Sequence, residues 1–375
     1  MTHSRVSVTA QEQCRRMEGG CPPLLSVLVL NWNGERFLRP CFNSLLLESS
    51  PEVELILVDN GSTDQSVERV RKEFPQVRVI EHGQNLGFSR GYNKAVPQAR
   101  GGILAFLNND TTVEPGWWKP LVQMLSRRSE IGVLTCKLLL RNTETLNNAG
   151  GYFKLWTGGG ELGYGREVDH FPSSKVIEPF FASGAAMAIR KETFEKLGGF
   201  DETLFAYGED LDLSWRARLM GLKVRYVPES AVHHHHSGTW GVFNPQKVRL
   251  VTRHHLRAVL KCLSWPHLLH SVPAYVLFAI AKGLALSVIQ RTPAYVTNVL
   301  LALWDLAAGC PEIWRSRRRV QAFRTISDRD ALRSENFGLL DPPWEFLRIL
   351  RVARQLNSRL RSALVENSAQ EANDE

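Results

Sequence analysis

Apolar and polar segments alternate along the first 110 residues in a pattern typical of a parallel α/β sheet. Short runs rich in β-branched residues, such as LSVLVLN, fit strands that are buried on both faces. A more polar segment of helical length follows each run. Strands are expected at residues 25–31, 54–60, 77–81 and 103–110, and helices at 35–48, 64–74 and 89–99. The alternation predicts βαβ units, and therefore a mostly parallel sheet with helices on both faces.

The pattern changes in the next hundred residues. Residues 142–182 are rich in glycine and irregular, so we expect loops or a small antiparallel insertion that can close over a substrate. A strand of small residues and a short helix ended by a glycine pair follow. In GEDLDLSWRARLMG, Leu211, Trp215 and Leu219 recur every four residues, which predicts a helix with one apolar face.

A separate C-terminal section carries the most apolar segment of the chain. SVPAYVLFAIAKGLALSVI is interrupted by a proline and a lysine and is only marginally long enough to span a bilayer. We favour a helix pair at, or partly in, a membrane surface, because the nearby WRSRRRVQAFR and two tryptophans supply basic and aromatic groups. The alternative is a helical domain that packs these faces internally. The final NSAQEANDE is polar and expected to be disordered.

Composition narrows the class of protein. The 375 residues are 43% hydrophobic and 22% charged, as in a folded enzyme. The formal charge of +8 suits phosphorylated ligands, anionic lipids or nucleic acid, but no helix-turn-helix, zinc-finger or aromatic RNA motif supports the last. Six scattered cysteines form no CxxC pair, and the first twenty residues lack an apolar signal region. We therefore expect a cytoplasmic protein with a mobile N-terminal tail.

Polar clusters follow three of the predicted parallel strands. They read NWN, VDNGSTD and LNND, and each stands where its strand ends. Ligands of open parallel sheets bind beyond the carboxyl ends of the strands, so the three clusters are expected to converge on one crevice. Each cluster alone could simply form a turn. Their recurrence on successive strands favours a binding site.

The LNND cluster contains a candidate metal ligand. Asn108 and Asp110 are two residues apart, and so lie on the same side of an extended chain. A carboxylate here can hold Mg²⁺ or Mn²⁺, which usually takes its remaining ligands from substrate phosphates and water. The alternative is that Asp110 caps a helix that begins near Pro115.

The segment GEDLDLSWR supplies a candidate base. It places Asp210 at a helix N-terminus, where the helix dipole favours the ionised carboxylate. The alternative is that Glu209, Asp210 and Asp212 merely complement the dipole.

Four consecutive histidines end a predicted strand, in VPESAVHHHH. Alternate residues of a strand face opposite sides, so at most two of them, such as His234 and His236, can point into one site. One of these could complete the coordination of a metal. The alternative is a solvated strand end.

Taken in order, LSVLVLNWNG, ILVDNGSTD, NLGFSRGYNKA, LNND, GGFDETLFAYGEDLDLSWR and VPESAVHHHHSGT resemble the family 2 glycosyltransferases. The resemblance covers residues 25–240 and is greatest to the bacterial rhamnosyltransferases and other enzymes of polysaccharide assembly. It implies the GT-A fold, in which a nucleotide-binding α/β sheet is fused to an acceptor-binding part. The expected organisation is a flexible tail at 1–23, a GT-A domain at 24–242 with donor half 24–135 and acceptor half 136–242, a C-terminal helical section at 243–360, and a disordered tail at 361–375.

The resemblance also assigns roles to residues. Donor contacts are implied for Asn31, Trp32, Asp59, Asn85, Gly87, Asn93 and Asn108. Within this set, Asn31 and Trp32 would line the base pocket, and Asp59 would accept a hydrogen bond from the imide N–H of uracil or thymine. Asn108 stands at the first position of the DxD motif and departs from it. Metal ligands are implied at Asp110 and, counting from Pro228 and Glu229, at His234. Asp210 would be the general base, with Gly184 and Glu209 on the acceptor side.

These assignments predict one reaction. A sugar moves with inversion from a dTDP- or UDP-sugar, with dTDP-rhamnose as the leading donor, to a hydroxyl of a lipid-linked or polysaccharide acceptor. Mn²⁺ or Mg²⁺ assists, and the enzyme is expected at the inner face of the cytoplasmic membrane, on an anionic surface, without nucleic acid. A sugar nucleotidyltransferase is one alternative, disfavoured because no early glycine-rich loop with basic residues is present. A catalytically silent nucleotide-sugar-binding scaffold is the other.

Overall fold

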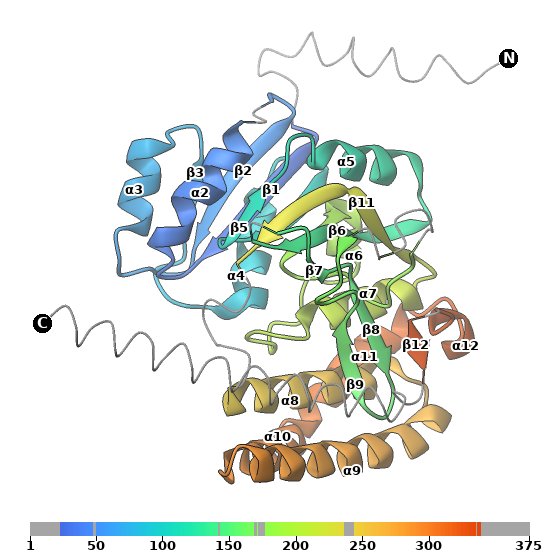
Figure 1. The fold of residues 1–375 in the computed structure, drawn as a ribbon. Helices are drawn as coiled ribbons and strands as arrows, with labels where there is room; N and C mark the ends of the chain where they lie inside the picture. The colour runs from blue at the N-terminus through green and yellow to red at the C-terminus, as the bar shows by residue number, and fades with distance from the viewer. Residues whose placement is uncertain are drawn as a thin grey trace, which may run out of the picture.

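A computed structural model describes residues 23–47, 50–141, 143–168, 171, 177–235, 244–334 and 336–338. Its centre is a nine-stranded sheet in the order β3-β2-β1-β4-β10-β6-β11-β5, with β7 paired to β6 (Figure 1). The strands are β1 (Leu25–Asn31), β2 (Val53–Asp59), β3 (Arg78–Glu81), β4 (Ile103–Asn108), β5 (Thr111–Val113), β6 (Ile131–Leu140), β7 (Leu146–Asn148), β10 (Ala186–Arg190) and β11 (Lys223–His234).

The first four strands are parallel, and their positions match the predicted ones to within two residues. β10 runs antiparallel between β4 and β6, and β11 runs parallel to β6. Only β5, β7 and β10 oppose the common direction among the described strands of this sheet. The mostly parallel sheet predicted from the alternating pattern is therefore confirmed.

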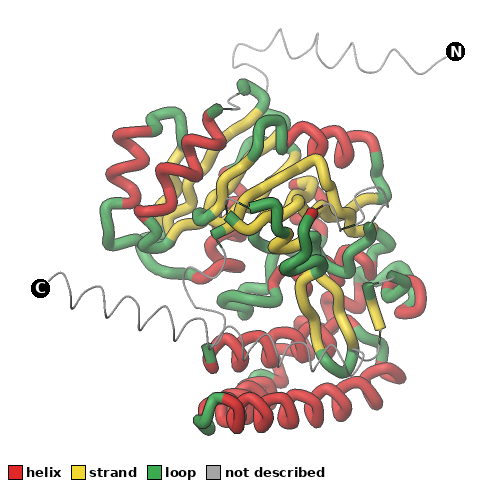
Figure 2. Tube along the Cα trace, in the orientation of Figure 1, coloured by secondary structure: helices red, strands yellow, loops and turns green. Residues whose placement is uncertain are grey.

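Helices cover both faces of the sheet, as predicted (Figure 2). One face carries α2 (Glu35–Leu46), α3 (Ser66–Glu73) and α5 (Trp118–Arg127), and the other carries α4 (Gly87–Ala95), η1 (Val96–Gln98), α6 (Lys191–Lys196) and α7 (Glu209–Leu219). Since side chains on both sheet faces are packed under helices, the strands read as continuous apolar runs.

A second, three-stranded sheet extends from the main body toward the helical layer (Figure 1). It consists of the antiparallel pair β8 (Gly151–Lys154) and β9 (Gly158–Glu161), with β12 (Phe337–Gly338) beside β8. The glycines here permit close packing: a Cβ atom on Gly151 would lie 2.0 Å from the ring of Phe181. The small antiparallel insertion expected in the glycine-rich segment is present.

The C-terminal helices form a layer below this hairpin. They are α8 (Pro245–Cys262), α9 (Trp265–Ile289), α10 (Ala294–Ala308), α11 (Cys310–Ala322) and α12 (Asp328–Ala331). One side of this layer packs against α7, where Leu211, Trp215 and Leu219 are all buried. The predicted apolar face of α7 thus contacts the helical layer, while Leu213 and Ala217 on its other side pack under the main sheet.

Helix α9 is the one described helix that is long and apolar enough to cross a membrane, and 22% of its most apolar window is buried. Its inner side packs on α8 and α10, whereas Leu269, Leu277, Leu284 and Val288 are exposed. The helix pair packs one side internally, as the second interpretation from the sequence expected, and contact of its outer side with a membrane stays a prediction. Residues 1–22, residues 361–375 and His236 lie outside the described residues, and the expectations for them stay predictions.

Candidate active site

A large cavity of about 1000 Å³ opens at the carboxyl ends of the central strands. This is the upper end of the size range of small-molecule sites. The main sheet, the start of α7, the β8–β9 hairpin and the helices α8 to α10 contribute to its walls. Ten of the twelve residues singled out from the sequence line it: Asn31, Trp32, Asn85, Gly87, Asn108, Asp110, Gly184, Glu209, Asp210 and His234.

Asp110 and His234 form one corner of the cavity. They are neighbours because β5, which follows Asp110, pairs with β11 and sets Thr111 opposite His234. His234 Nε2 lies 3.3 Å from an Asp110 carboxylate oxygen and 3.5 Å from the Asn108 amide nitrogen. Its Nδ1 donates to the Asn147 side-chain oxygen at 2.8 Å, which orients Nε2 toward Asp110. Burial raises the pKa of Asp110, but contact with His234 outweighs this and holds that pKa below its usual value.

The structure separates the four histidines. His233 Nε2 lies 3.1 Å from a Glu114 carboxylate oxygen, and the His235 ring packs against Phe37 in a tilted arrangement, with 5.4 Å between the ring centroids. Of the three described histidines, His234 is the one whose ring contacts the Asp110 carboxylate, whereas His235 donates its backbone N–H to the Asp110 carbonyl at 3.0 Å. His236 lies outside the described residues.

Asp110 does not cap the next helix, which was the alternative considered from the sequence. It lies in the turn between β4 and β5, and α5 begins only at Trp118. The helix-cap alternative is therefore wrong, because a short strand intervenes.

The Asp110 and His234 side chains fit a divalent cation that takes its remaining ligands from a substrate. Within the described ranges, no three His, Cys, Asp or Glu side chains converge into a complete metal site. The pair Asp110 and His234 offers one carboxylate oxygen and one imidazole nitrogen. Such a pair leaves coordination positions for phosphate oxygens and water.

Asp210 occupies a second corner, in the first turn of α7. Its carboxylate accepts hydrogen bonds from the backbone N–H of Gly184 at 3.0 Å and of Leu211 at 2.7 Å. Gly208, just before the helix, has φ of +87°, a conformation that strains other residues. Burial raises the pKa of Asp210 above its ordinary value, despite the two N–H donors. The carboxylate is thus fixed in orientation and more basic than one in water.

Glu209 lies beside Asp210 in a different environment. Burial, reinforced by the negative charge of Asp210, raises the pKa of Glu209 well above the ordinary value. Its Oε2 atom is buried and makes no hydrogen bond. The two adjacent carboxyl groups therefore differ in their hydrogen bonds, since of the two only Asp210 accepts a backbone N–H on each of its oxygens.

The donor end of the cavity is built from the β1 terminus and neighbouring loops. Asn31 accepts a hydrogen bond from the Asn109 amide at 2.6 Å and donates one to Ser62 at 3.1 Å. Trp32 follows at the rim, with 48% of its surface exposed. Asn85 accepts the Gly87 N–H at 2.9 Å and so fixes the start of α4. The exposed indole offers a flat surface on which a planar base can stack.

Two of the expected donor contacts do not line the cavity. Asp59 is buried and accepts the backbone N–H groups of Gly61 and Ser62, both at 3.0 Å. Asn93 is bonded to both the N–H and the carbonyl of Phe200, each at 2.8 Å. In this structure both side chains shape loops around the site, and direct donor contacts by them stay predictions.

Sequence analysis missed several residues of the cavity wall. Glu161 on β9 lines it and keeps an exposed surface, but the protein atoms that surround it in the cavity raise the pKa of its carboxyl group. It interacts electrostatically with Lys247, His234 and Asp210. Lys247 comes from α8, more than eighty residues later. The glycine-rich segment was expected to close over a substrate, but no single residue of it was assigned, and nothing in the sequence indicated that a helix of the C-terminal section would join it there.

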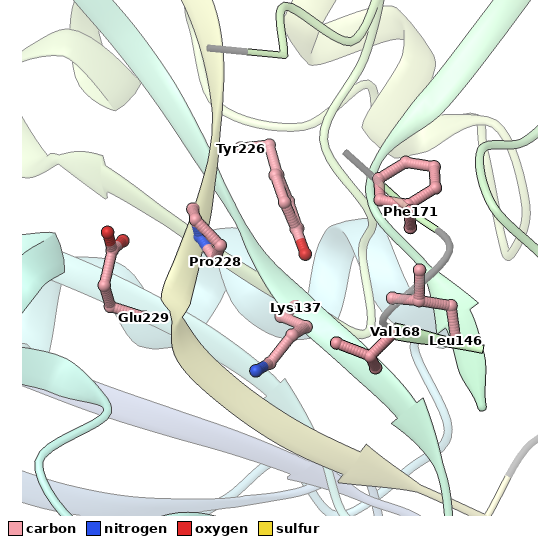
Figure 3. A pocket seen from close by; sticks show the side chains of 7 residues that line it. All are labelled: Lys137, Leu146, Val168, Phe171, Tyr226, Pro228 and Glu229. Atoms are coloured by element: carbon pink, nitrogen blue, oxygen red, sulfur yellow. The ribbon is translucent and has the colours of Figure 1, made fainter. Parts of the chain in front are cut away.

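A second, smaller pocket of about 220 Å³ lies on another part of the molecule (Figure 3). Tyr226, Phe171 and Val168 supply much of its apolar wall, with Lys137 and Glu229 as its charged groups. None of its seven lining residues is a candidate from the sequence, and it offers no pair of carboxylates. It carries no functional assignment.

Comparison with known proteins supplies a family. Residues 26–198 match the model of the glycosyl transferase family 2, and residues 168–237 match that of the N-terminal domain of galactosyltransferase. Among solved structures, GalNAc-T7 with UDP, GalNAc and Mn²⁺ aligns with a TM-score of 0.51 at 19% identity, over 64% of this chain and 48% of that one. TarS 1–349 of S. aureus with UDP-GlcNAc aligns with a TM-score of 0.50 at 19% identity, over 80% and 91%. These likenesses identify the GT-A fold.

Two curated relatives are similar in sequence. The O-antigen biosynthesis protein RfbC of Myxococcus xanthus is 30% identical over 58% of this chain and 18% of its own length. The N-acetylglucosaminyl-diphospho-decaprenol L-rhamnosyltransferase of Mycobacterium tuberculosis is 29% identical over 55% of this chain and 73% of its own. The chain thus spans less than a fifth of the first relative and about three quarters of the second. Residues 26–198 of the chain therefore form a glycosyl transferase family 2 domain.

Proposed function

We propose that this protein transfers a sugar, with inversion, from a dTDP- or UDP-sugar to a hydroxyl group of a lipid-linked or polysaccharide acceptor in cell-envelope assembly. The observation that carries the proposal is the meeting of the Asp110–His234 pair and the fixed Asp210 carboxylate in one cavity. The name of the mycobacterial relative supports a rhamnosyl donor, and dTDP-rhamnose is the leading choice.

In this proposal Asp110 and His234 hold a divalent cation, Mn²⁺ or Mg²⁺. The presence of Mn²⁺ in the GalNAc-T7 structure agrees with this choice. A cation at this corner would neutralise charge on the diphosphate leaving group. Asn108 and Asn147 keep the His234 ring in place, and Asn31 and Trp32 hold the base end of the donor.

Asp210 acts as the general base. Its oxygens, held by the Gly184 and Leu211 N–H groups, take the proton from the acceptor hydroxyl as that oxygen attacks the anomeric carbon. The bond from this carbon to the diphosphate oxygen breaks in the same displacement, so configuration inverts. No covalent sugar–enzyme intermediate is needed, and positioning by the fixed carboxylate provides much of the rate enhancement.

The proposal places the enzyme on an anionic membrane surface, at the inner face of the cytoplasmic membrane. The outer sides of α9 and α10 expose Leu277, Leu284, Leu300 and Trp304. Next to them, α11 carries an arginine-rich sequence. Apolar and aromatic residues beside arginines suit the boundary between lipid headgroups and acyl chains.

A panel of nucleotide sugars tests the proposal. Thermal stabilisation and slow donor hydrolysis are measured for each sugar with Mn²⁺, Mg²⁺ or EDTA. We expect metal-dependent stabilisation by one thymidine or uridine sugar. Folded protein that responds to none of them would favour a silent scaffold, and release of pyrophosphate from a nucleoside triphosphate would favour a nucleotidyltransferase.

The Asp210→Asn variant tests the role of the base in the same assay. Because Asp210 acts on the acceptor and not on the donor, donor stabilisation is expected to persist. Transfer should fall by a factor on the order of 10²–10⁴, the usual contribution of a general base. Loss of donor binding in a folded variant would contradict the assigned role.

A further inference from the structure

The cavity extends well beyond the space around Asp110 and Asp210. It continues between the β8–β9 hairpin and the helices α8, α9 and α10. This distal part is lined by Val251 on α8, by Tyr275, Phe278, Ala279 and Leu286 on α9, and by Val299 on α10. Such a wall offers contacts to a hydrocarbon chain and few hydrogen-bonding groups to a sugar chain.

Two lysines line the same cavity as these apolar residues. Lys247 comes from α8 and Lys282 from α9, and both line the cavity. Lys247 Nζ lies 5.0 Å from the ring centroid of Tyr207, and the charge of Glu161 on β9 also acts on this lysine. Lys282 is close enough to His255 for its charge to lower the pKa of that imidazole. Ammonium groups at such a junction suit phosphate oxygens.

The helices that wall the apolar end also face outward. Tyr275 and Ala279 lie on the inner side of α9, whereas Leu277 and Leu284 on its outer side are 69% and 51% exposed. One helix therefore separates the cavity from the surface proposed to contact lipid.

We propose that this extension binds the lipid diphosphate part of the acceptor, with the hydrocarbon chain along α9 and α10 and the diphosphate between Lys247 and Lys282. The sugar attached to that diphosphate then projects toward Asp210. The inference rests on the proposed function and makes it more specific, since a free polysaccharide would leave the apolar end without a partner. The cavity offers carboxylates, ammonium groups and apolar side chains, which are the partners that the sugar, the diphosphate and the hydrocarbon chain of such an acceptor require.

Direct binding tests the site without requiring turnover. The probe is a fluorescent farnesyl diphosphate, titrated into the full-length protein without donor, with farnesol and inorganic pyrophosphate as competitors. We expect the diphosphate lipid to bind more tightly than either competitor. Equal affinity for farnesol would show that the lysines contribute nothing, and would overturn the proposed diphosphate position.

Two pairs of matched variants locate the binding. Val251→Trp fills the apolar end, whereas Val288→Trp makes the same change on the exposed side of α9. We expect Val251→Trp to weaken probe binding about tenfold or more, equivalent to the loss of roughly one buried side chain, and Val288→Trp to leave it unchanged. Equal effects of both, or of neither, would contradict the site.

The second pair removes charge. The double variant Lys247→Met/Lys282→Met should reduce affinity for farnesyl diphosphate about tenfold while leaving farnesol unaffected, and Lys223→Met, exposed at the start of β11, should change neither. Each variant is checked for folding by thermal melting.

Donor hydrolysis by the wild type separates the proposed transferase function from the proposed lipid diphosphate site. Lipid binding as expected without any donor turnover would refute the transferase, and turnover without cavity-dependent lipid binding would refute this site.

Discussion

At the scale of residues, Glu209 and Asp210 show how two adjacent carboxyl groups acquire different roles. Both line the cavity and both have raised pKa values because of burial. Asp210 nevertheless has two backbone donors that favour its ionised form, while Glu209 has an unpaired oxygen and a negative neighbour. Asp210 therefore ionises more readily than Glu209, which stays protonated to higher pH.

This difference predicts a pH-dependent effect of Glu209→Gln on stability. A carboxyl group whose folded pKa is raised above its unfolded value contributes stability that is present below the unfolded pKa and is lost as pH rises through the folded pKa. Glutamine does not ionise, so the variant escapes this loss. The difference in Tm between variant and wild type should become more positive by several degrees from pH 5 to pH 8.

Differential scanning fluorimetry at the two pH values measures this. Glu68→Gln, an exposed position on α3, serves as the control and should follow the wild type. A Tm difference for Glu209→Gln that does not change with pH would show that Glu209 ionises normally in the folded protein.

At the scale of elements, helix α7 is the connection between the catalytic sheet and the helical layer. Its sequence predicts one apolar face, yet Asp212 and Arg216 are buried as well. Arg216 donates to Asp212 at 2.8 Å, and Lys261 from α8 makes ion pairs with both Asp212 and Asp201. This buried network fixes the start of α7, and thereby Asp210, against α8.

Replacement of Lys261 by methionine should destabilise this element strongly. Lys261 is 1% exposed and neutralises two buried carboxylates, so its loss leaves them without that partner. We expect a cost of about 3–5 kcal/mol in the free energy of unfolding, as found for broken buried ion pairs. Urea unfolding measures it, with the exposed Lys223→Met as the control; a cost below 1 kcal/mol would show that water or other groups replace the lysine.

At the scale of the whole molecule, the protein has two distinct sides. The main sheet and its covering helices form one body, and α9 and α10 form an outer layer on the far side of the cavity (Figure 1). This layer exposes large apolar side chains at several positions, of which Trp304 is 72% exposed. The cavity lies between these two parts. A membrane contact through the outer layer would therefore bring a membrane-borne acceptor close to Asp110 and Asp210.

Vesicle binding tests this arrangement. The double variant Leu277→Gln/Leu284→Gln should reduce binding to phosphatidylglycerol-containing vesicles by about tenfold or more, because each leucine loses on the order of 1.5 kcal/mol of apolar burial. The control Leu47→Gln also replaces a leucine, which is 82% exposed at the end of α2, and should leave vesicle binding unchanged. Co-sedimentation gives the measurement, and binding of all three proteins to pure phosphatidylcholine at the same strength would argue against a specific anionic surface.

The fold of the first 110 residues could be predicted because local pattern and global structure agree there. Each apolar run became a strand, and β1 was placed without error at Leu25–Asn31. The clusters after β1 and β4 met in one cavity because parallel strands bring their carboxyl ends to one edge. Asp110 could not be separated from a helix cap by its local sequence, since β5 is too short to be recognised.

The sequence by itself determined the sheet, the family and most of the polar residues around the cavity, because these depend on short periodic patterns and on motifs within single strands and loops. Only the tertiary structure decided that His234, of the described histidines, contacts the Asp110 carboxylate, that Asp59 and Asn93 bond to neighbouring loops, and that Glu161, Lys247 and Lys282 line the cavity. The physical reason is distance along the chain. These contacts join strands and helices through long-range pairing and packing, which local composition does not encode.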